Sequence, residues 1–224
     1  MKDSTILQKT EEHASEGLSL NSPEVPLTRR TSLLTKLFKV EWDKHFPFNI
    51  PDCDCTIAYI GPELAFQFIR ESYGEIFELE LWKNPFLAEQ QTEAKLQYYR
   101  ECGDFFMIYK KSQPIGIFIG TLTDWSSYYF RSAAVLPQHQ GNGAIARLLP
   151  YLTKILTDSG IARIESDASV SNFTSIQILL RARFKVTGMQ LSERWGALLH
   201  FTKFLSPSSE KIFVGQFCPE SNLT

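Results

Sequence analysis

The stretch from Arg131 to Leu149 reads RSAAVLPQHQGNGAIARLL, and the interpretation of the fold starts from it. The residues before Pro137 predict a strand that ends there, because proline has no N–H to donate to a sheet. Gly141 and Gly143 lie in the polar turn that follows, and apolar residues then recur at helical spacing to about residue 158. A strand, a glycine turn and a helix N-terminus in this order predict a phosphate-binding site, since the first N–H groups of a helix lack partners within it.

Two other phosphate-binding motifs fit this turn less well. A dinucleotide site has Gly-x-Gly-x-x-Gly after the first strand of a parallel unit, whereas the third glycine position here is Ala146 and the preceding strand belongs to an antiparallel series. A nucleoside-triphosphate loop has Gly-Lys followed by Ser or Thr, and no lysine follows Gly143. Both motifs remain weaker alternatives.

Around the turn, the sequence predicts alternating strands and helices. Strands are expected over 55–60, 104–110, 114–123, 126–135, 161–167, 184–193 and 197–205, and helices over 63–73, 87–101, 142–158 and 172–182. The first of these helices is expected to turn Leu64, Phe68 and Ile69 inward. Residues 76–82 alternate apolar and acidic, which fits either a strand or an irregular loop. This order predicts a mixed α/β (α+β) fold, with a sheet of about seven strands of mixed direction and helices on both faces.

Composition divides the chain into four parts. Residues 1–30 are polar and predict a mobile tail, 31–50 form an extension, 51–206 form the main domain and 207–224 form a C-terminal tail. Within the extension, apolar residues at helical spacing predict an amphipathic helix over 31–46. This helix is expected to pack onto the main domain, and the alternative is a contact with a partner or within a homodimer.

The overall composition excludes several classes of protein. The 224 residues include 23 Lys and Arg and 25 Asp and Glu, for a formal net charge of −2, which argues against a nucleic-acid partner bound in the usual electrostatic way. A hydrophobic share of 43% is enough for a sizeable core. No apolar run approaches the roughly 18 residues that span a bilayer, and no apolar signal-peptide core follows the N-terminus. We therefore expect no membrane span and a cytoplasmic location.

The cysteines do not predict disulfides or a metal site. Four cysteines in a chain of this length are too few for a disulfide framework. Cys53 and Cys55 are close together, but Cys102 and Cys218 are far away in sequence, and none has the paired spacing of zinc ligands. We expect four reduced thiols and no metal.

The glycine turn resembles the coenzyme A motif of the GNAT superfamily of N-acetyltransferases. That motif is Gln or Arg, two residues, Gly, one residue, and Gly or Ala, and it is filled here by Gln138, Gly141 and Gly143. It follows a strand that ends in Val-x-Pro, as at Val135 and Pro137. The resemblance extends over roughly residues 55–205.

A second feature of the superfamily follows about 30 residues later. Asn172 and Ser175 match the asparagine and the small residue that open the next helix beside the pantetheine arm of coenzyme A. Asn172 is also a good helix N-cap, so a purely structural role is equally open.

The resemblance implies a GNAT-like sheet that splays between its fourth strand (126–135) and its fifth (161–167) and holds acetyl-CoA there as cosubstrate. Backbone groups at Val135 would bind the pantetheine arm, and amides from Gln140 to Ala144 would hold the pyrophosphate. The cofactor-binding residues implied in this way are Val135, Gln138, Gln140, Gly141, Asn142, Gly143, Ala144, Asn172 and Ser175.

The function implied is transfer of an acetyl group from acetyl-CoA to an amine of a small molecule or peptide by direct attack. Two departures from the family pattern support an alternative, a non-catalytic module that binds acyl-CoA or a partner protein. The tyrosine that the family commonly places seven residues after the asparagine is Leu179, and carboxylates often present on the fourth strand are replaced by Arg131 and Ser132.

The candidates for acid and base are therefore drawn from other positions. Glu80 is a candidate base because the family builds its acceptor site between the first two helices, although a solvated strand face explains it as well. Asp167 ends the fifth strand beside the expected cofactor slot. Tyr128 and Tyr129 must face opposite sides of their strand, and Tyr129 is the candidate acid that would replace the missing tyrosine.

Overall fold

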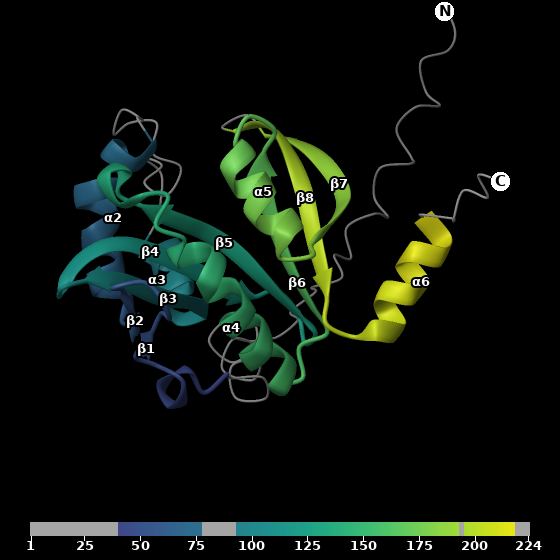
Figure 1. Cartoon of the computed structure of the whole chain (residues 1–224), viewed down its shortest axis with the longest axis horizontal. Helices are drawn as coiled ribbons and strands as arrows, with labels where there is room; N and C mark the ends of the chain where they lie inside the picture. The colour runs from purple at the N-terminus through teal and green to yellow at the C-terminus, as the bar shows by residue number, and fades with distance from the viewer. Residues whose placement is uncertain (1–39, 78–92, 193–194, 218–224) are drawn as a thin grey trace, which may run out of the picture.

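The computed structural model describes residues 40–77, 93–192 and 195–217. Its strands form one sheet of eight in the order β1-β2-β3-β4-β5-β6-β8-β7 (Figure 1). The strands are β1 (Phe48–Asn49), β2 (Thr56–Ile60), β3 (Gly103–Lys110), β4 (Gln113–Leu122), β5 (Ser127–Val135), β6 (Arg163–Ser169), β7 (Lys185–Ser192) and β8 (Gly196–Phe204). The helices are α2 (Pro62–Phe77), α3 (Glu93–Cys102), α4 (Ala144–Asp158), α5 (Phe173–Arg181) and α6 (Pro207–Phe217), with 3-10 turns at η1 (Trp42–Lys44) and η3 (Pro137–His139). The predicted mixed α/β fold is confirmed, and the short β1 is added to the seven expected strands.

The sheet opens between β5 and β6, the one parallel pair among the described strands. Their pairing runs from Ser127 opposite Arg163 to Phe130 opposite Ser166 and goes no further. β5 nevertheless continues to Val135 and β6 to Ser169. The two strands therefore separate toward their C-terminal ends, which confirms the expected splay between strands 126–135 and 161–167.

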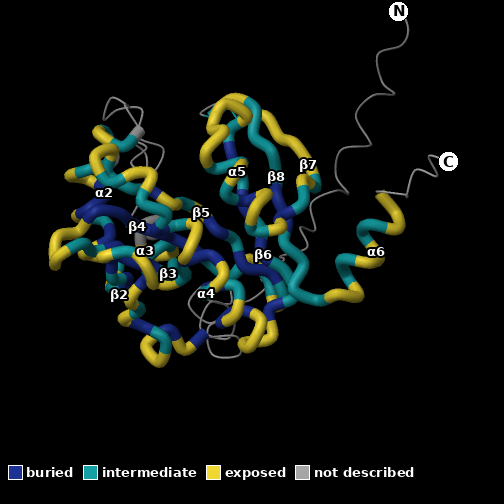
Figure 2. Tube along the Cα trace, viewed as in Figure 1, coloured by how far each residue is buried: buried dark blue, intermediate teal, exposed yellow. Residues whose placement is uncertain are grey.

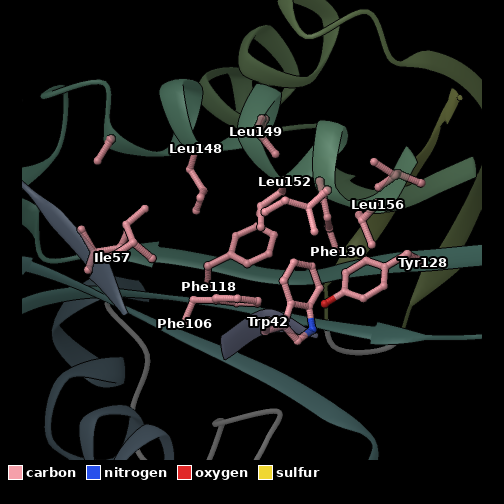
Figure 3. Packing of buried hydrophobic residues seen from close by; sticks show 14 of the residues in the cluster. Trp42, Ile57, Phe106, Phe118, Tyr128, Phe130, Leu148, Leu149, Leu152 and Leu156 are labelled. Atoms are coloured by element: carbon pink, nitrogen blue, oxygen red, sulfur yellow. The ribbon is translucent and has the colours of Figure 1, made fainter. Parts of the chain in front are cut away.

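One face of the sheet is covered by α4 and α5. The buried leucines of α4 point onto a layer of aromatic rings that rise from the strands (Figure 3). These leucines are Leu148, Leu149, Leu152 and Leu156, and the rings beneath them include Phe106, Phe118, Tyr128 and Phe130. Burying each leucine contributes roughly 1.5–3 kcal/mol, which far outweighs the backbone hydrogen bond that Pro150 removes on the exposed side of the helix.

The opposite face is covered by α2. Its buried residues Ala65, Phe68 and Ile69 pack against apolar side chains of β3, β4 and β5. The inward orientation expected for Phe68 and Ile69 is confirmed. That of Leu64 is wrong, because its side chain is 44% exposed and Ala65, one position later, takes the inward place.

The N-terminal extension packs onto the α4 side of the sheet. Val40, Trp42 and Phe46 are buried there, and the Trp42 ring meets the edge of Phe106 at 5.0 Å between centroids. The predicted α-helix over 31–46 is wrong over the described residues, where the chain forms only the η1 turn. A residue that precedes a proline is disfavoured in a helix, and Pro47 stands here between η1 and β1. Residues 31–39 lie outside the described residues.

The C-terminal segment contains a helix where the sequence analysis expected a tail. α6 follows β8 and lies beside the end of the sheet, with the Phe213 ring 5.1 Å from that of Phe204 (Figure 1). Exposed residues dominate its surface in Figure 2. Neither α6 nor any other described helix is long and apolar enough to cross a membrane.

Candidate functional site

The glycine turn connects the open end of β5 to the start of α4. η3 follows β5 directly, and Gly141 and Gly143 then adopt left-handed backbone conformations with φ of +74° and +78°. Any other L-residue pays about 1–2 kcal/mol for that conformation, which accounts for glycine at both positions. Gly143 is the N-cap of α4, so the N–H groups that have no partner within the helix begin at the turn.

Side chains of the turn are held by local hydrogen bonds. Asn142 Oδ1 accepts from the Ala144 N–H at 2.9 Å, and Asn142 Nδ2 lies 3.8 Å from the sulfur of the buried Cys55. Arg147 Nη1 donates to the Asn142 carbonyl at 2.8 Å, and a Cβ on Gly143 would clash with this guanidinium. Arg147 was not among the residues predicted from the sequence, although its position one helical turn after Gly143 predicts that it lies over the turn. Its positive charge adds to the attraction of the helix N-terminus for an anion.

At the end of β5, the carbonyl of Val135 accepts a hydrogen bond from a side chain of the glycine turn. Gln140 Nε2 donates to the Val135 carbonyl at 3.0 Å, so this side chain bridges the end of the strand and the glycine turn. Val135 is the residue whose backbone the family resemblance assigns to the pantetheine arm. A bound arm would therefore meet Gln140 at the same place.

Asn172 begins α5 on the other side of the opening. Its Oδ1 accepts from the Ser175 N–H at 3.0 Å, which confirms the N-cap role. Because β5 and β6 are parallel, their C-terminal ends and the starts of α4 and α5 lie at the same edge of the sheet. A cofactor role for Asn172 and Ser175 stays a prediction.

A cluster of polar side chains lies on the sheet face away from α4. Asp167 of β6 is its centre and accepts at both carboxylate oxygens. Oδ2 accepts from the Tyr129 hydroxyl at 2.7 Å and from Gln190 Nε2 at 2.9 Å, while Oδ1 lies 2.7 Å from His200 Nδ1. We call Tyr129, Asp167, Gln190 and His200 the Asp167 cluster. It draws one residue from each of four strands.

Strand register brings this cluster together. Asp167 pairs directly with His200 across β6 and β8. Tyr129 pairs with Glu165, which is two residues before Asp167 and shares its face of the sheet. Tyr128 points to the other face, is fully buried and donates to Asp104 Oδ2 at 2.8 Å. The expected opposite orientation of the two tyrosines is confirmed, and only Tyr129 lies in the cluster.

The surroundings of Tyr129 keep its phenol protonated. Burial, and then the hydrogen bond and negative charge of Asp167, raise the pKa of Tyr129 well above its ordinary value, although Arg131 opposes the shift. Arg131 stands at a bulge of β5 and donates to the Tyr99 hydroxyl of α3 at 2.7 Å. The wall of the site that faces α3 is therefore positively charged and aromatic.

The remaining site predictions have mixed outcomes. Glu80 lies outside the described residues, so its role as a base stays a prediction. Leu179 of α5 points into the core and is buried, and as a leucine it supplies no acid at the position of the family tyrosine. His200 and Gln190 were missed, because nothing in their spacing connects them with Asp167. Within the described ranges, no group of three or more His, Cys, Asp or Glu is arranged to hold a metal ion.

Comparison with known proteins identifies the family. The family model described as the acetyltransferase (GNAT) family matches residues 66–183, which is more than half of the chain, and the chain belongs to that family. A search of curated proteins found no match.

Solved GNAT structures share the fold at low sequence identity. A putative acetyltransferase of the GNAT family from Desulfovibrio desulfuricans has a TM-score of 0.54 at 12% identity, covering 68% of this chain and 99% of that one. The putative acetyltransferase yncA from Salmonella typhimurium, solved with acetyl-CoA, has a TM-score of 0.51 at 18% identity, covering 69% and 95%. RimL, an alpha-N-protein acetyltransferase in complex with coenzyme A, has a TM-score of 0.53 at 10% identity, covering 70% and 96%.

Proposed function

We propose that this protein transfers the acetyl group of acetyl-CoA to an amine of a small molecule or a peptide by direct attack. The observation that carries the proposal is the opening between β5 and β6 beyond Phe130 and Ser166. It has the glycine turn at its edge and the Asp167 cluster on the sheet face away from α4. Membership in the GNAT acetyltransferase family supports acetyl transfer in general.

The residues at this opening fit acetyl-CoA. The left-handed glycines and the N–H groups at the start of α4 that have no partner within the helix suit a pyrophosphate, and Arg147 supplies a cation beside them. The edge of β5 beyond Phe130 is unpaired toward β6, so its backbone can hydrogen-bond an extended chain such as pantetheine. This path supports the cofactor-binding roles that we propose for Val135, Gln138, Gln140, Gly141 and Asn142.

Acetyl transfer to an amine makes three demands on the protein. The thioester must be oriented, the amine must lose a proton, and the departing thiolate must gain one. Strand β5 would orient the thioester, and the polar face with Asp167, His200 and Arg131 would receive the acceptor. Because Leu179 cannot supply a proton, the thiolate would be protonated by another group or by solvent.

The buried Leu179 also favours a second candidate function. A protein that binds acetyl-CoA without catalysis needs no acid at this position, so the chain could serve as an acyl-CoA-binding or protein-interaction module. The cofactor half of the site would be identical in both cases. Only turnover separates them.

The test measures binding and turnover separately. Calorimetry with acetyl-CoA is expected to give saturable binding, and a thiol reagent is expected to detect coenzyme A release with at least one member of an amine panel. The panel contains a polyamine, a free amino acid, a peptide with a free N-terminus and an N-terminally blocked peptide with an internal lysine. Binding without release for every amine would support the module, and no binding at all would refute both candidates.

A matched variant controls for background hydrolysis of the thioester. Gly143→Glu puts a negative charge where the pyrophosphate is expected and should weaken acetyl-CoA binding at least tenfold, because like charges repel at close range. Release that persists in this variant at the wild-type rate would not come from the proposed site.

The cytoplasmic location and the homodimer remain predictions.

A further inference from the structure

We infer that His200, oriented by Asp167, is the general base that takes the proton from the acceptor amine. The inference rests on the proposed function and adds to it the residue that activates the acceptor. It follows from the geometry of the Asp167 cluster rather than from any position in the GNAT motif.

The hydrogen bond to Asp167 uses one ring nitrogen of His200 and leaves the other available for proton transfer. Nδ1 lies 2.7 Å from Asp167 Oδ1, and a carboxylate at that distance fixes the proton on Nδ1. Nε2 is then the basic nitrogen, and no hydrogen bond or ion pair to it is found among the described residues. The His200 side chain is 32% exposed while that of Asp167 is 14% exposed, so the imidazole is accessible and its partner is shielded.

The other oxygen of Asp167 is held by two further donors. Tyr129 and Gln190 both donate to Oδ2, which fixes the plane of the carboxylate and therefore the orientation of the ring. Tyr129 and Gln190 are positioning residues in this arrangement. Among the described residues, the other charged groups on this face include Glu165 and Arg163 of β6 and Arg131 of β5.

Among the described residues, the other groups near the opening are poorer bases. Glu165 is held in an ion pair with Arg163 at 3.0 Å. Tyr129 remains protonated because burial and Asp167 raise its pKa. Asp167 itself accepts three hydrogen bonds and is shielded by its donors. His200 therefore has the free, accessible nitrogen that the reaction needs.

Proton transfer through His200 accompanies the transfer of the acetyl group. The amine nitrogen forms a bond to the acetyl carbon while His200 Nε2 accepts a proton from that nitrogen. The bond between the acetyl carbon and sulfur breaks, and the sulfur keeps its electron pair. The imidazolium then releases the proton to the departing thiolate, so the products are the acetamide and coenzyme A thiol. The Asp167 carboxylate stabilises the transient positive charge on the ring.

Two variants test the assignment with the best amine of the panel. His200→Gln removes the base and is expected to lower kcat/KM by about 10²–10⁴-fold, with acetyl-CoA affinity unchanged by calorimetry. Asp167→Asn is expected to lower kcat/KM by a similar factor, because an amide N–H toward Nδ1 forces the proton onto Nε2 and blocks the basic nitrogen. The wild-type pH profile of kcat/KM is expected to have an ascending limb, and both variants should lose it.

Adjacent tyrosines provide the matched control. Tyr129→Phe is expected to lower kcat roughly fivefold with little change in KM, the effect of one lost hydrogen bond to Asp167. Tyr128→Phe also loses a hydrogen bond to an aspartate, on the opposite face of the sheet, and should leave kcat unchanged. Thermal unfolding of each variant shows whether it is folded at the assay temperature.

The outcomes separate this inference from the proposed function. The assignment is supported if the wild type turns over and both His200→Gln and Asp167→Asn turn over much more slowly while still binding acetyl-CoA. If folded His200→Gln keeps the wild-type rate and pH profile, His200 is not the base, and the proposed function is unaffected. If His200→Gln does not fold, an unchanged pH profile and rate in Asp167→Asn refutes the assignment in the same way. Absence of wild-type turnover with every amine refutes both.

Discussion

The two glycines at the ends of α4 allow the phosphate turn to be tested against a control of equal backbone strain. Gly143 precedes the helix with φ of +78°, and Gly160 follows it with φ of +81°. A Cβ on Gly143 would displace the Arg147 guanidinium, whereas a Cβ on Gly160 would meet nothing within 4 Å. Gly143→Ala and Gly160→Ala therefore share the same strain at opposite ends of one helix.

The left-handed backbone of the two glycines sets the expected loss of stability in each variant. Forcing alanine into the left-handed region costs about 1–2 kcal/mol, partly offset because alanine has less freedom than glycine in the unfolded chain. Each variant should lose about 1 kcal/mol, and Gly143→Ala slightly more, since Arg147 must leave the Asn142 carbonyl. For a chain of this size, 1 kcal/mol corresponds to about 2–4 °C in Tm.

Affinity for acetyl-CoA should separate the two variants. A methyl group on Gly143 would keep phosphate oxygens from the N–H groups of the turn, and one lost charge-assisted hydrogen bond is worth about 1.5–3 kcal/mol. Gly143→Ala should therefore bind acetyl-CoA about 10- to 100-fold more weakly. Gly160→Ala should bind like the wild type. Calorimetry measures the affinity, and a thermal melt without ligand measures the stability.

Two results would refute the reasoning. Wild-type affinity in Gly143→Ala would mean that the turn does not hold the cofactor, whatever happens to the stability. An equal loss of affinity in Gly160→Ala would mean that binding responds to strain anywhere along α4 rather than to the space above Gly143.

Substitutions at three further positions test the description of the site and of the strands and turns that support it. Asn172→Ala should cost about 1 kcal/mol of stability through the lost cap on the Ser175 N–H, and Asn172→Ser should restore the stability, so any deficit in acetyl-CoA affinity that remains in the serine variant measures contact with the cofactor. Gly120→Ala should lower the free energy of unfolding in urea by about 1–3 kcal/mol, because its Cβ would overlap the fully buried Tyr128 ring. Burial raises the pKa of Asp124, but hydrogen bonds from the following turn and a nearby arginine outweigh it and lower the pKa overall. Asp124→Asn should therefore lower Tm at neutral pH, and the difference should disappear as the pH falls below about 4 and through the lowered pKa of the folded state, where the wild-type carboxyl is protonated as well.

The part of the site that could be predicted is the part made from one continuous segment. Pro137, Gly141 and Gly143 each have a backbone reason for their identity, since one ends a strand and two occupy left-handed conformations. Their order along the chain is also their order in space. The same is true of α4, whose buried leucines recur at the period of a helix.

Predictions were wrong where a neighbouring residue overrides a periodic pattern. Apolar spacing around Trp42 fits a helix, but Pro47 and the pairing of β1 with β2 end any helix there, and Trp42 is buried from a 3-10 turn instead. Leu64 and Ala65 are adjacent on α2, and hydrophobicity alone favours the leucine. The tight approach of the helix to the sheet favours the smaller residue, which is 0% exposed.

The Asp167 cluster illustrates why the acceptor half could not be assembled from the sequence. Its members lie on four strands, and 33 residues separate Asp167 from His200. Each residue has an ordinary explanation as the polar face of a strand, since side chains alternate across a sheet whatever their function. His200 joins the cluster because it is the residue of β8 directly opposite Asp167. Its strand follows β7 in sequence but lies between β6 and β7 in the sheet. A shift of one residue in that pairing would turn the imidazole into the core beneath α5 and leave the carboxylate without its partner. The chemistry of the acceptor half therefore depends on strand order and register, which are set by the packing of the whole sheet.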